Sequence, residues 1–244
     1  MRIVLSNSHL EAVDTVATMV LDRITSHPKS VIGLATGRTM EPVYAEWVSK
    51  AREHNTDFDS CFFFMLDEYL GLNENHPSSF KSYIKKHLLT PLELKENQFA
   101  FPPVHASVLR EAGFQYERML KESGGIDIQL LGIGQNGHIG FNEPGSSPDS
   151  LTRIVRLTPD TQEANRSHFG AGEMPKEALS MGIKSIMSGK SLVMLATGKS
   201  KADAIKYLIN HHDDPACPAT YLKSHPHFTL VLDPDAASKV NLKI

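Results

Sequence analysis

The stretch IDIQLLGIGQNGHIGFNEPG, residues 126–145, runs from an apolar segment into a loop that contains five glycines. Residues 126–134 have the length and composition of a buried strand. Each glycine costs backbone entropy on folding, so a loop this rich in glycine is expected to turn sharply or to approach another group closely. Asn136, His138 and Glu143 belong to the same loop. One segment therefore predicts a buried strand and also contains candidate catalytic residues.

Other apolar runs resemble this one and are expected to form strands, at residues 2–5, 30–36, 61–66, 191–197 and 227–233. The segments between them have apolar residues at helical spacing. They predict helices over residues 10–24, 43–53, 78–89, 107–123 and 198–210. Asn7 or Ser8 is suited to cap the first helix, Pro42 to start the second, and Ser78 or Ser79 to cap the third.

The expected strands are apolar along their whole length instead of alternating with polar residues. Such strands are buried on both faces, as in a parallel sheet covered by helices. No linker rich in Pro, Ser or Gly divides the chain. The sequence therefore predicts one domain over residues 1–244, a doubly wound, mostly parallel α/β sheet with helices on both faces, which is a Rossmann-like three-layer sandwich. Ligands of such sheets bind beyond the carboxyl ends of the strands.

Composition narrows the class of protein. The chain has 244 residues, 25 Lys and Arg, 28 Asp and Glu, and a formal net charge of −3. This balance favours neither a nucleic-acid partner nor a membrane partner. The two cysteines, Cys61 and Cys217, are too few for a disulfide framework. No apolar run has transmembrane length, and the N-terminus lacks a signal-peptide core. We expect a cytoplasmic protein.

Two similar turns follow two of the expected strands. GLATGRT (33–39) contains Thr36, Gly37, Arg38 and Thr39, and MLATGKS (194–200) repeats its pattern. Glycine at such a turn lets backbone N–H groups face a ligand, and a helix N-terminus with a basic side chain favours an anion. Neither turn has the dinucleotide or Walker spacing, so a monophosphate suits them better than a nucleotide. Lys201 lies in the first helical turn after the second copy, an unfavourable place for a cation without an anion nearby.

A pair of acids, Asp67 and Glu68, directly follows the strand at 61–66 in MLDEYLGL (65–72). They are either a helix cap or solvated loop acids, or they place a carboxylate at the sheet edge as a general base. Metal sites usually gather several carboxylate or His ligands. His76 is the nearest other ligand type and no convincing set is present, so neither a metal nor a cofactor is expected.

In the glycine-rich loop, Glu143 is able to fold back and accept a hydrogen bond from one ring nitrogen of His138. That bond would fix the tautomer and orient the other nitrogen for proton transfer. Asn136 is suited either to hold a substrate hydroxyl or to steer the same ring. Together with the phosphate-binding turns and the carboxylate, the loop predicts proton transfer on a small phosphorylated substrate.

LDEYLGL and GIGQNGHIGFNEPGSS together resemble the glucosamine-6-phosphate deaminase family, also called glucosamine-6-phosphate isomerases. LATGRT, PKEALSMGI and GKSKADAI extend the similarity over nearly the whole chain. The resemblance implies a cofactor-free enzyme of amino-sugar catabolism that converts D-glucosamine 6-phosphate and water to D-fructose 6-phosphate and ammonia. It implies that Asp67 moves a proton from C2 to C1, that His138 assists ring opening, and that Glu143 orients His138.

The resemblance also implies which residues hold the substrate. The phosphate ligands would be Thr36, Gly37, Arg38, Thr39 and Lys201, with Gly137 beside the sugar. Arg166 in ANRSHF (164–169) is a further candidate, although its register is shifted by one residue from the family pattern.

Two departures from the family pattern carry expectations. Some members have Asp at the position of Asn136, and Asn, having no charge, should stabilise protonated His138 less than Asp does. Allosteric members are hexamers with extra C-terminal sequence and a set of basic residues, of which Arg153 keeps one while Val155 replaces another. We therefore expect no activation by N-acetylglucosamine 6-phosphate, and a monomer or small homo-oligomer.

Two alternatives share this fold. A 6-phosphogluconolactonase needs a water-activating His but no base at C2, so the LDEY motif favours the deaminase. A non-catalytic sugar-phosphate sensor would normally carry a DNA-binding helix-turn-helix and could lose Asp67 or His138, both of which are present.

Overall fold

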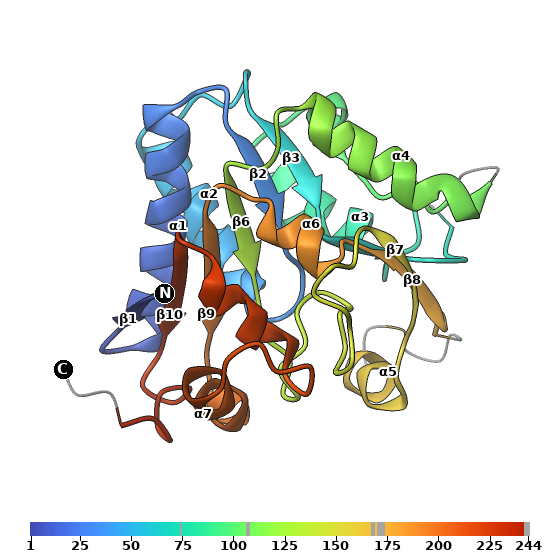
Figure 1. The fold of residues 1–244 in the computed structure, drawn as a ribbon. Coiled ribbons are helices and arrows are strands. Elements are labelled where there is room, and N and C mark those ends of the chain that lie inside the picture. The colour runs from blue at the N-terminus through green and yellow to red at the C-terminus, as the bar shows by residue number, and fades with distance from the viewer. Residues whose placement is uncertain (74, 106–107, 167–168, 170–173, 242–244) are drawn as a thin grey trace.

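The computed structural model describes residues 1–73, 75–105, 108–166, 169 and 174–241, and Figure 1 shows the path of the chain. Its main sheet has the strand order β1-β10-β9-β6-β2-β3-β5, and all neighbours are parallel. All the strands predicted from the sequence are confirmed, and a short one, β5, was not predicted. The strands are β1 (Arg2–Leu5), β2 (Val31–Leu34), β3 (Phe62–Met65), β5 (Phe99–Ala100), β6 (Ile128–Leu131), β9 (Leu192–Ala196) and β10 (Phe228–Leu232).

Helices cover both faces of this sheet, as the uniformly apolar strands predict. Side chains that alternate along a strand enter opposite cores: Phe63 and Met65 pack in the core under α1 and α2, whereas Phe64 and Leu66 pack in the core under α4, α6 and α7. The doubly wound α/β fold is therefore confirmed. The helices are α1 (His9–Ser26), α2 (Met40–Glu53), α4 (Leu109–Glu122), α6 (Ile183–Met187) and α7 (Ala202–Asn210).

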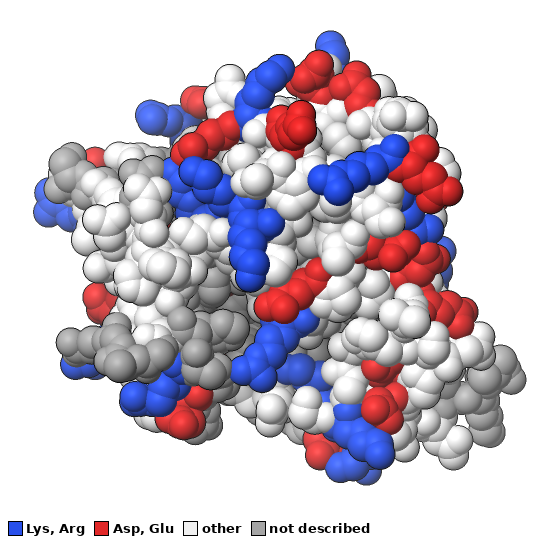
Figure 2. Space-filling view, turned by 180° about the vertical axis from the view of Figure 1, so that it is seen from behind, with Lys and Arg blue, Asp and Glu red and all other residues white. Residues whose placement is uncertain are grey.

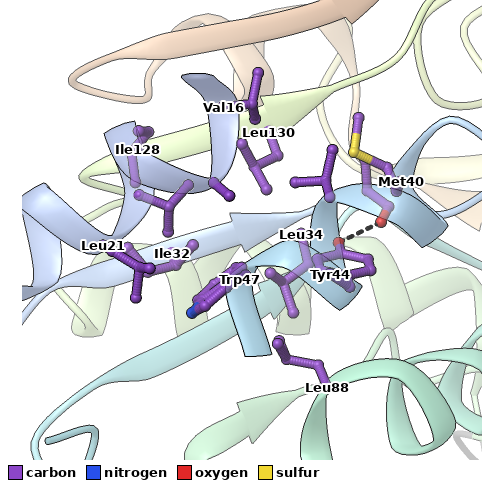
Figure 3. Close-up of a cluster of buried hydrophobic side chains, with 14 of the residues drawn as sticks. Val16, Leu21, Ile32, Leu34, Met40, Tyr44, Trp47, Leu88, Ile128 and Leu130 are labelled. Carbon is purple, nitrogen blue, oxygen red and sulfur yellow. Dashed lines mark hydrogen bonds between the residues drawn. The ribbon is translucent and has the colours of Figure 1, made fainter. Parts of the chain in front are cut away.

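The α1/α2 core shows how the sequence pattern becomes packing. Tyr44 and Trp47 from α2 lie against apolar side chains of the central strands (Figure 3). Both rings are fully buried, and the Tyr44 hydroxyl donates to the carbonyl of Ala35 at 2.5 Å. This bond satisfies a buried polar group and ties α2 to the residue that precedes the first Thr-Gly turn.

Helix boundaries follow the predicted caps in two of three cases. Ser8 accepts from the N–H of Glu11, and Ser79 accepts from the N–H of Ser82. The second helix begins at Met40, ahead of the predicted start at Pro42, which lies in its first turn where a missing N–H costs nothing. The helix predicted over 78–89 is in fact α3 (Phe80–Ile84) followed by a π-helical turn, η1 (Lys85–Leu89).

A second, antiparallel sheet was not predicted. It has the order β4-β8-β7 and consists of β4 (Asp67–Tyr69), β8 (Glu177–Ser180) and β7 (Arg153–Arg156). Asp67 pairs with Ser180, and both are buried. The helix α5 (Pro159–Asn165) connects β7 towards β8 and was not predicted either. This sheet places the acid pair, β7 and β8 beside the exit of β3.

The remaining elements are short helical turns: η2 (Glu96–Gln98), η4 (Lys199–Lys201) and η5 (Pro218–Ser224). On the face in Figure 2, acidic and basic side chains are interspersed, in keeping with the small net charge. Within the described ranges, no helix combines the length and the apolar character that a membrane span requires.

Candidate active site

A cavity of about 710 Å³ opens at the carboxyl ends of β2, β3, β6 and β9. In the sheet, β6 lies between β2 and β9, so the glycine-rich loop emerges between the two Thr-Gly turns. Parallel strands bring all their carboxyl ends to one edge, which is why residues far apart in sequence meet here. The predicted site residues that line the cavity are Thr36, Gly37, Arg38, Thr39, Asp67, Asn136, His138 and Lys201.

The two Thr-Gly turns have the same backbone shape but different internal bonds. Gly37 has φ 100° and Gly198 has φ 84°, a conformation that residues with a Cβ rarely adopt. The Tyr83 hydroxyl donates to the carbonyl of Gly37 at 2.9 Å. The N–H of Gly198 donates instead to the buried carboxylate of Asp233, at 3.1 and 3.0 Å. The second turn therefore offers side chains to a ligand, not this N–H.

Lys201 brings a partly desolvated cation to the cavity. Burial lowers the pKa of its ammonium group. Among the residues that the structure describes, no carboxylate lies within ion-pair distance of it, and Thr197 and Ser200 line the wall beside it. An anionic ligand would compensate this cation, which agrees with the phosphate predicted from the sequence.

The two neighbouring acids have different environments. Glu68 accepts from the N–H groups of Tyr69, Phe80 and Lys81 at 2.8, 3.0 and 2.8 Å, so its carboxylate caps the start of α3. Asp67 is 4% exposed and lines the cavity, and its carboxylate accepts no hydrogen bond from any described residue. Burial, and then the charge of Glu68, raise the pKa of Asp67 to about 8. The sequence left three alternatives open for these acids. Glu68 is a helix cap, Asp67 is a carboxylate in the cavity, and neither is a solvated loop acid.

This burial has a measurable cost in stability. Between the ordinary Asp pKa of 3.8 and the native value of about 8, the folded chain binds more protons at Asp67 than the unfolded chain, so stability falls as pH rises through that window. Each pKa unit corresponds to about 1.4 kcal/mol, which sets an upper bound of roughly 6 kcal/mol. We expect Asp67→Asn to raise the free energy of unfolding, by little at pH 5 and by most at pH 9. Urea denaturation at both pH values measures this, and a gain that is independent of pH would contradict it.

His138 is held by a chain of hydrogen bonds. Its Nδ1 lies 2.7 Å from Asn136 Oδ1, and Asn136 Nδ2 donates to Glu143 Oε2 at 2.9 Å. Because a carboxylate only accepts, the amide must turn its NH₂ group to Glu143 and its oxygen to the ring. Nδ1 of His138 then carries a proton, and Nε2 is the nitrogen left for proton transfer in the neutral ring.

Glu143 orients the His138 ring chiefly through its hydrogen bond with Asn136. Its Oε2 lies 3.5 Å from His138 Nδ1, whereas the sequence predicted a direct hydrogen bond. Burial by itself raises the pKa of Glu143, but the nearby imidazole of His138 and the hydrogen bonds of Thr161 and Asn136 outweigh it and lower the pKa to about 2. The carboxylate is therefore ionised at neutral pH, and Asn136 is the direct partner of the ring.

Replacing the Asn136 amide by a carboxylate tests the series of hydrogen bonds that holds His138. Asn136→Asp would place a negative charge 2.7 Å from Nδ1 and stabilise the protonated ring. It would also remove the donor to Glu143 and set two carboxylates against each other. We expect the limb of the pH–rate profile that reports His138 to move to higher pH by about one unit. The control is Asn210→Asp at the end of α7, and superimposable profiles for wild type and Asn136→Asp would refute the expectation.

Three predicted residues lie elsewhere than on the cavity wall. Glu143 lies behind Asn136, as described above. Gly137 has φ 83°, and a Cβ on it would lie 2.2 Å from the sulfur of Cys217, so it is needed for close packing. Arg166 is largely exposed at the end of α5, and its Nε lies 3.3 Å from a carboxylate oxygen of Glu163. The structure does not bring Arg166 together with the other predicted phosphate ligands.

The structure adds residues that sequence reasoning missed. Tyr83, Asn165 and Thr161 line the cavity from α3 and α5. Tyr83 belongs to a segment that shows only a helical pattern, and no motif marks the two residues of α5. In the described part of the chain, no group of three His, Cys, Asp or Glu side chains is placed to hold a metal ion.

Comparison with known proteins agrees with this geometry. Residues 6–231 match the family model for glucosamine-6-phosphate isomerases/6-phosphogluconolactonase. A glucosamine-6-phosphate deaminase from Rhodopirellula baltica is 43% identical over 94% of this chain and 92% of its own. A solved structure of a monomeric glucosamine-6-phosphate deaminase superposes with a TM-score of 0.95 at 36% identity, covering 98% of this chain and 100% of that one.

More distant structures share the fold alone. A 6-phosphogluconolactonase from Leishmania guyanensis is 19% identical, with a TM-score of 0.77 over 99% of both chains. The resemblance first read from LDEYLGL and the glycine-rich loop is thus confirmed at the level of the family. By a family match over most of its length and a relative of more than 40% identity, this chain belongs to the glucosamine-6-phosphate isomerase/6-phosphogluconolactonase family.

Proposed function

We propose that the protein is a glucosamine-6-phosphate deaminase, which converts D-glucosamine 6-phosphate and water to D-fructose 6-phosphate and ammonia. The observation that carries this proposal is the buried carboxylate of Asp67, which faces the same cavity as the imidazole of His138. A deaminase needs both a base for C2 and a group for ring opening, whereas a lactonase needs no base at C2. The deaminase relatives described above support the same choice.

His138 would act first, on the closed sugar. Ring opening moves a proton from the hydroxyl at C1 to the ring oxygen. A neutral imidazole with a free Nε2 is able to accept the first proton and return it to the second position near neutral pH. Asn136 and Glu143 would keep this nitrogen facing the sugar, because they hold the proton on Nδ1.

Asp67 would act next, on the open chain. The aldehyde acidifies the C2–H bond, the carboxylate takes that proton, and the enolamine receives it back at C1. The resulting imine at C2 adds water and releases ammonia. Asp67 must be ionised to begin, and its pKa of about 8 would fall when the substrate's ammonium group binds beside it.

The phosphate would bind at the other end of the cavity. Thr36, Gly37, Arg38 and Thr39 form the first Thr-Gly turn and Lys201 follows the second, and all of them line the cavity. Binding an anion there would restore a partner to the half-buried ammonium group of Lys201. We leave Arg166 as a candidate that would have to turn away from Glu163 to reach the phosphate.

We also infer the setting in which the chain works. The solved relative is described as monomeric and superposes over its whole length, which favours a monomer. Val155, where allosteric members have a basic residue, favours a protein that is not activated by N-acetylglucosamine 6-phosphate. Residues 1–244 would act as one domain in the cytoplasm, on a small-molecule substrate, with no nucleic-acid partner and no cofactor.

The test is ammonia release by the purified protein from glucosamine 6-phosphate, run beside hydrolysis of 6-phosphoglucono-lactone. Ammonia release without lactone hydrolysis is the expected result. Lactone hydrolysis without ammonia release would assign the chain to the other branch of its family. Binding of sugar phosphate with neither reaction would favour a sensor.

A further inference from the structure

We propose that Thr161 in α5 is a positioning residue, which holds the proton of His138 on Nδ1 by fixing Glu143 and, through it, the Asn136 amide. This inference rests on the proposed function only in taking His138 as the group that moves protons. The hydrogen bonds of the arrangement are made by protein groups alone.

Both oxygens of the Glu143 carboxylate are held, and they are held from different parts of the chain. Oε2 accepts from Asn136 in the glycine-rich loop. Oε1 accepts a short hydrogen bond from the Thr161 hydroxyl and a longer one, 3.3 Å, from the Thr158 hydroxyl. Thr161 is 3% exposed and Glu143 is 9% exposed, so water has little access to replace these bonds.

The two threonines are not equivalent. Thr158 is the N-cap of α5, and its oxygen already accepts from the N–H of Thr161 at 3.3 Å. Its bond to Glu143 is the longer of the two. Thr161 therefore provides the principal anchor of Oε1, and Thr158 chiefly holds the helix turn on which Thr161 stands.

The direction of each hydrogen bond between Thr161 and His138 shows what the bond from Thr161 to Glu143 controls. With Oε1 fixed, Oε2 has one direction in which to accept from Asn136, and the amide oxygen is turned to the ring. Without the Thr161 hydroxyl, the carboxylate is free to rotate and the amide loses the acceptor that sets its orientation. A flipped amide would present its NH₂ to Nδ1, so the ring would carry its proton on Nε2 instead, where it could no longer accept one.

The same helix also reaches the cavity. Asn165 lines the cavity at the end of α5, and its Nδ2 donates to the carbonyl of Thr161 at 2.9 Å. A ligand that contacts Asn165 therefore contacts the turn that anchors Glu143. Substrate binding and the orientation of the proton-transfer group would share this one helix.

The test compares Thr161→Val, which removes the hydroxyl at nearly constant volume, with Thr161→Ser, which keeps it. The matched control is Thr15→Val on α1, whose hydroxyl donates to a backbone carbonyl far from the cavity. The first readout is ¹⁵N NMR of the imidazole of His138 in ligand-free protein, assigned by the signal that His138→Gln loses. We expect the Nδ1–H tautomer in wild type, Thr161→Ser and Thr15→Val, and a mixture of tautomers in Thr161→Val.

The second readout is the pH profile of ammonia release. We expect Thr161→Val to lower kcat by about tenfold, because in a mixture of tautomers fewer molecules have an Nε2 that accepts a proton, with KM nearly unchanged and the limb that reports His138 displaced. Thr161→Ser should restore the wild-type profile. Thr161→Ala replaces Thr161→Val should the valine variant not fold.

An unchanged Nδ1–H tautomer in the variant without the hydroxyl would overturn the inference, whatever its activity. A tautomer that depends on Thr161 in a protein that releases no ammonia would instead uphold the inference and refute the proposed deaminase. The NMR readout needs no substrate, so the two failures are distinguishable.

Discussion

Asp67→Asn is expected to reduce ammonia release from glucosamine 6-phosphate by at least about 10³-fold, because an amide cannot take the proton from C2. Asp67 is the carboxylate that lines the cavity without a hydrogen-bond donor among the described residues, whereas its neighbour Glu68 is committed to the start of α3. Among the described residues, no other Asp or Glu lines the cavity. The loss should therefore appear in kcat, with substrate binding retained.

The control for this variant is Asp59→Asn, the same chemical change at an exposed carboxylate that pairs with Lys95. Unfolding cannot mimic the expected loss, because removal of the buried carboxylate should make the protein more stable. Wild-type rates in Asp67→Asn would show that another group removes the proton. A loss confined to KM would make Asp67 a binding residue for the ammonium group and not the base.

His138→Gln is expected to lower ammonia release by about 10²-fold, because ring opening would then depend on the spontaneous reaction. The glutamine is similar in size and retains hydrogen bonding to Asn136, but it cannot exchange a proton near neutral pH. The proton transfer from C2 to C1 would remain intact. The loss should therefore be specific to substrates that must first open a ring.

An open-chain substrate separates the two steps. The 4,5-dideoxy analogue of glucosamine 6-phosphate cannot close a ring, so wild type and His138→Gln should turn it over at similar rates. His211→Gln is the matched control, since His211 stacks on Tyr207 outside the cavity. An equal loss on the cyclic and the open-chain substrates would place His138 in a later step.

The strands of the main sheet were predictable because their signal is local. A short run such as IDIQLL or SLVMLAT is apolar throughout, and both faces of the resulting strand are indeed buried. The rule that parallel strands bring their carboxyl ends to one edge then predicted where Asp67, His138 and the Thr-Gly turns would meet. The structure places all of them around a single cavity.

The antiparallel sheet β4-β8-β7 was not predictable in the same way. Its strands are three or four residues long, and β4 pairs with residues more than a hundred positions later. They read DEY, RIVR and EALS, so none is a continuous apolar run, and their conformation comes from the partner that they find in the folded chain. The burial of Asp67, and with it the raised pKa, follows from this pairing and not from its local sequence.

By itself, the sequence determined the class of fold, the sheet edge that carries the site, and the motifs of the family. Those features depend on residues that are close in the chain, where spacing and residue type act directly. Only the tertiary structure decided that Asn136 and not Glu143 hydrogen-bonds to the ring, that Thr161 anchors Glu143, that Tyr83 bonds to Gly37, and that Arg166 faces Glu163. These contacts depend on hydrogen-bond distances between side chains, and shifts of about one ångström, which no sequence pattern encodes, would remake them.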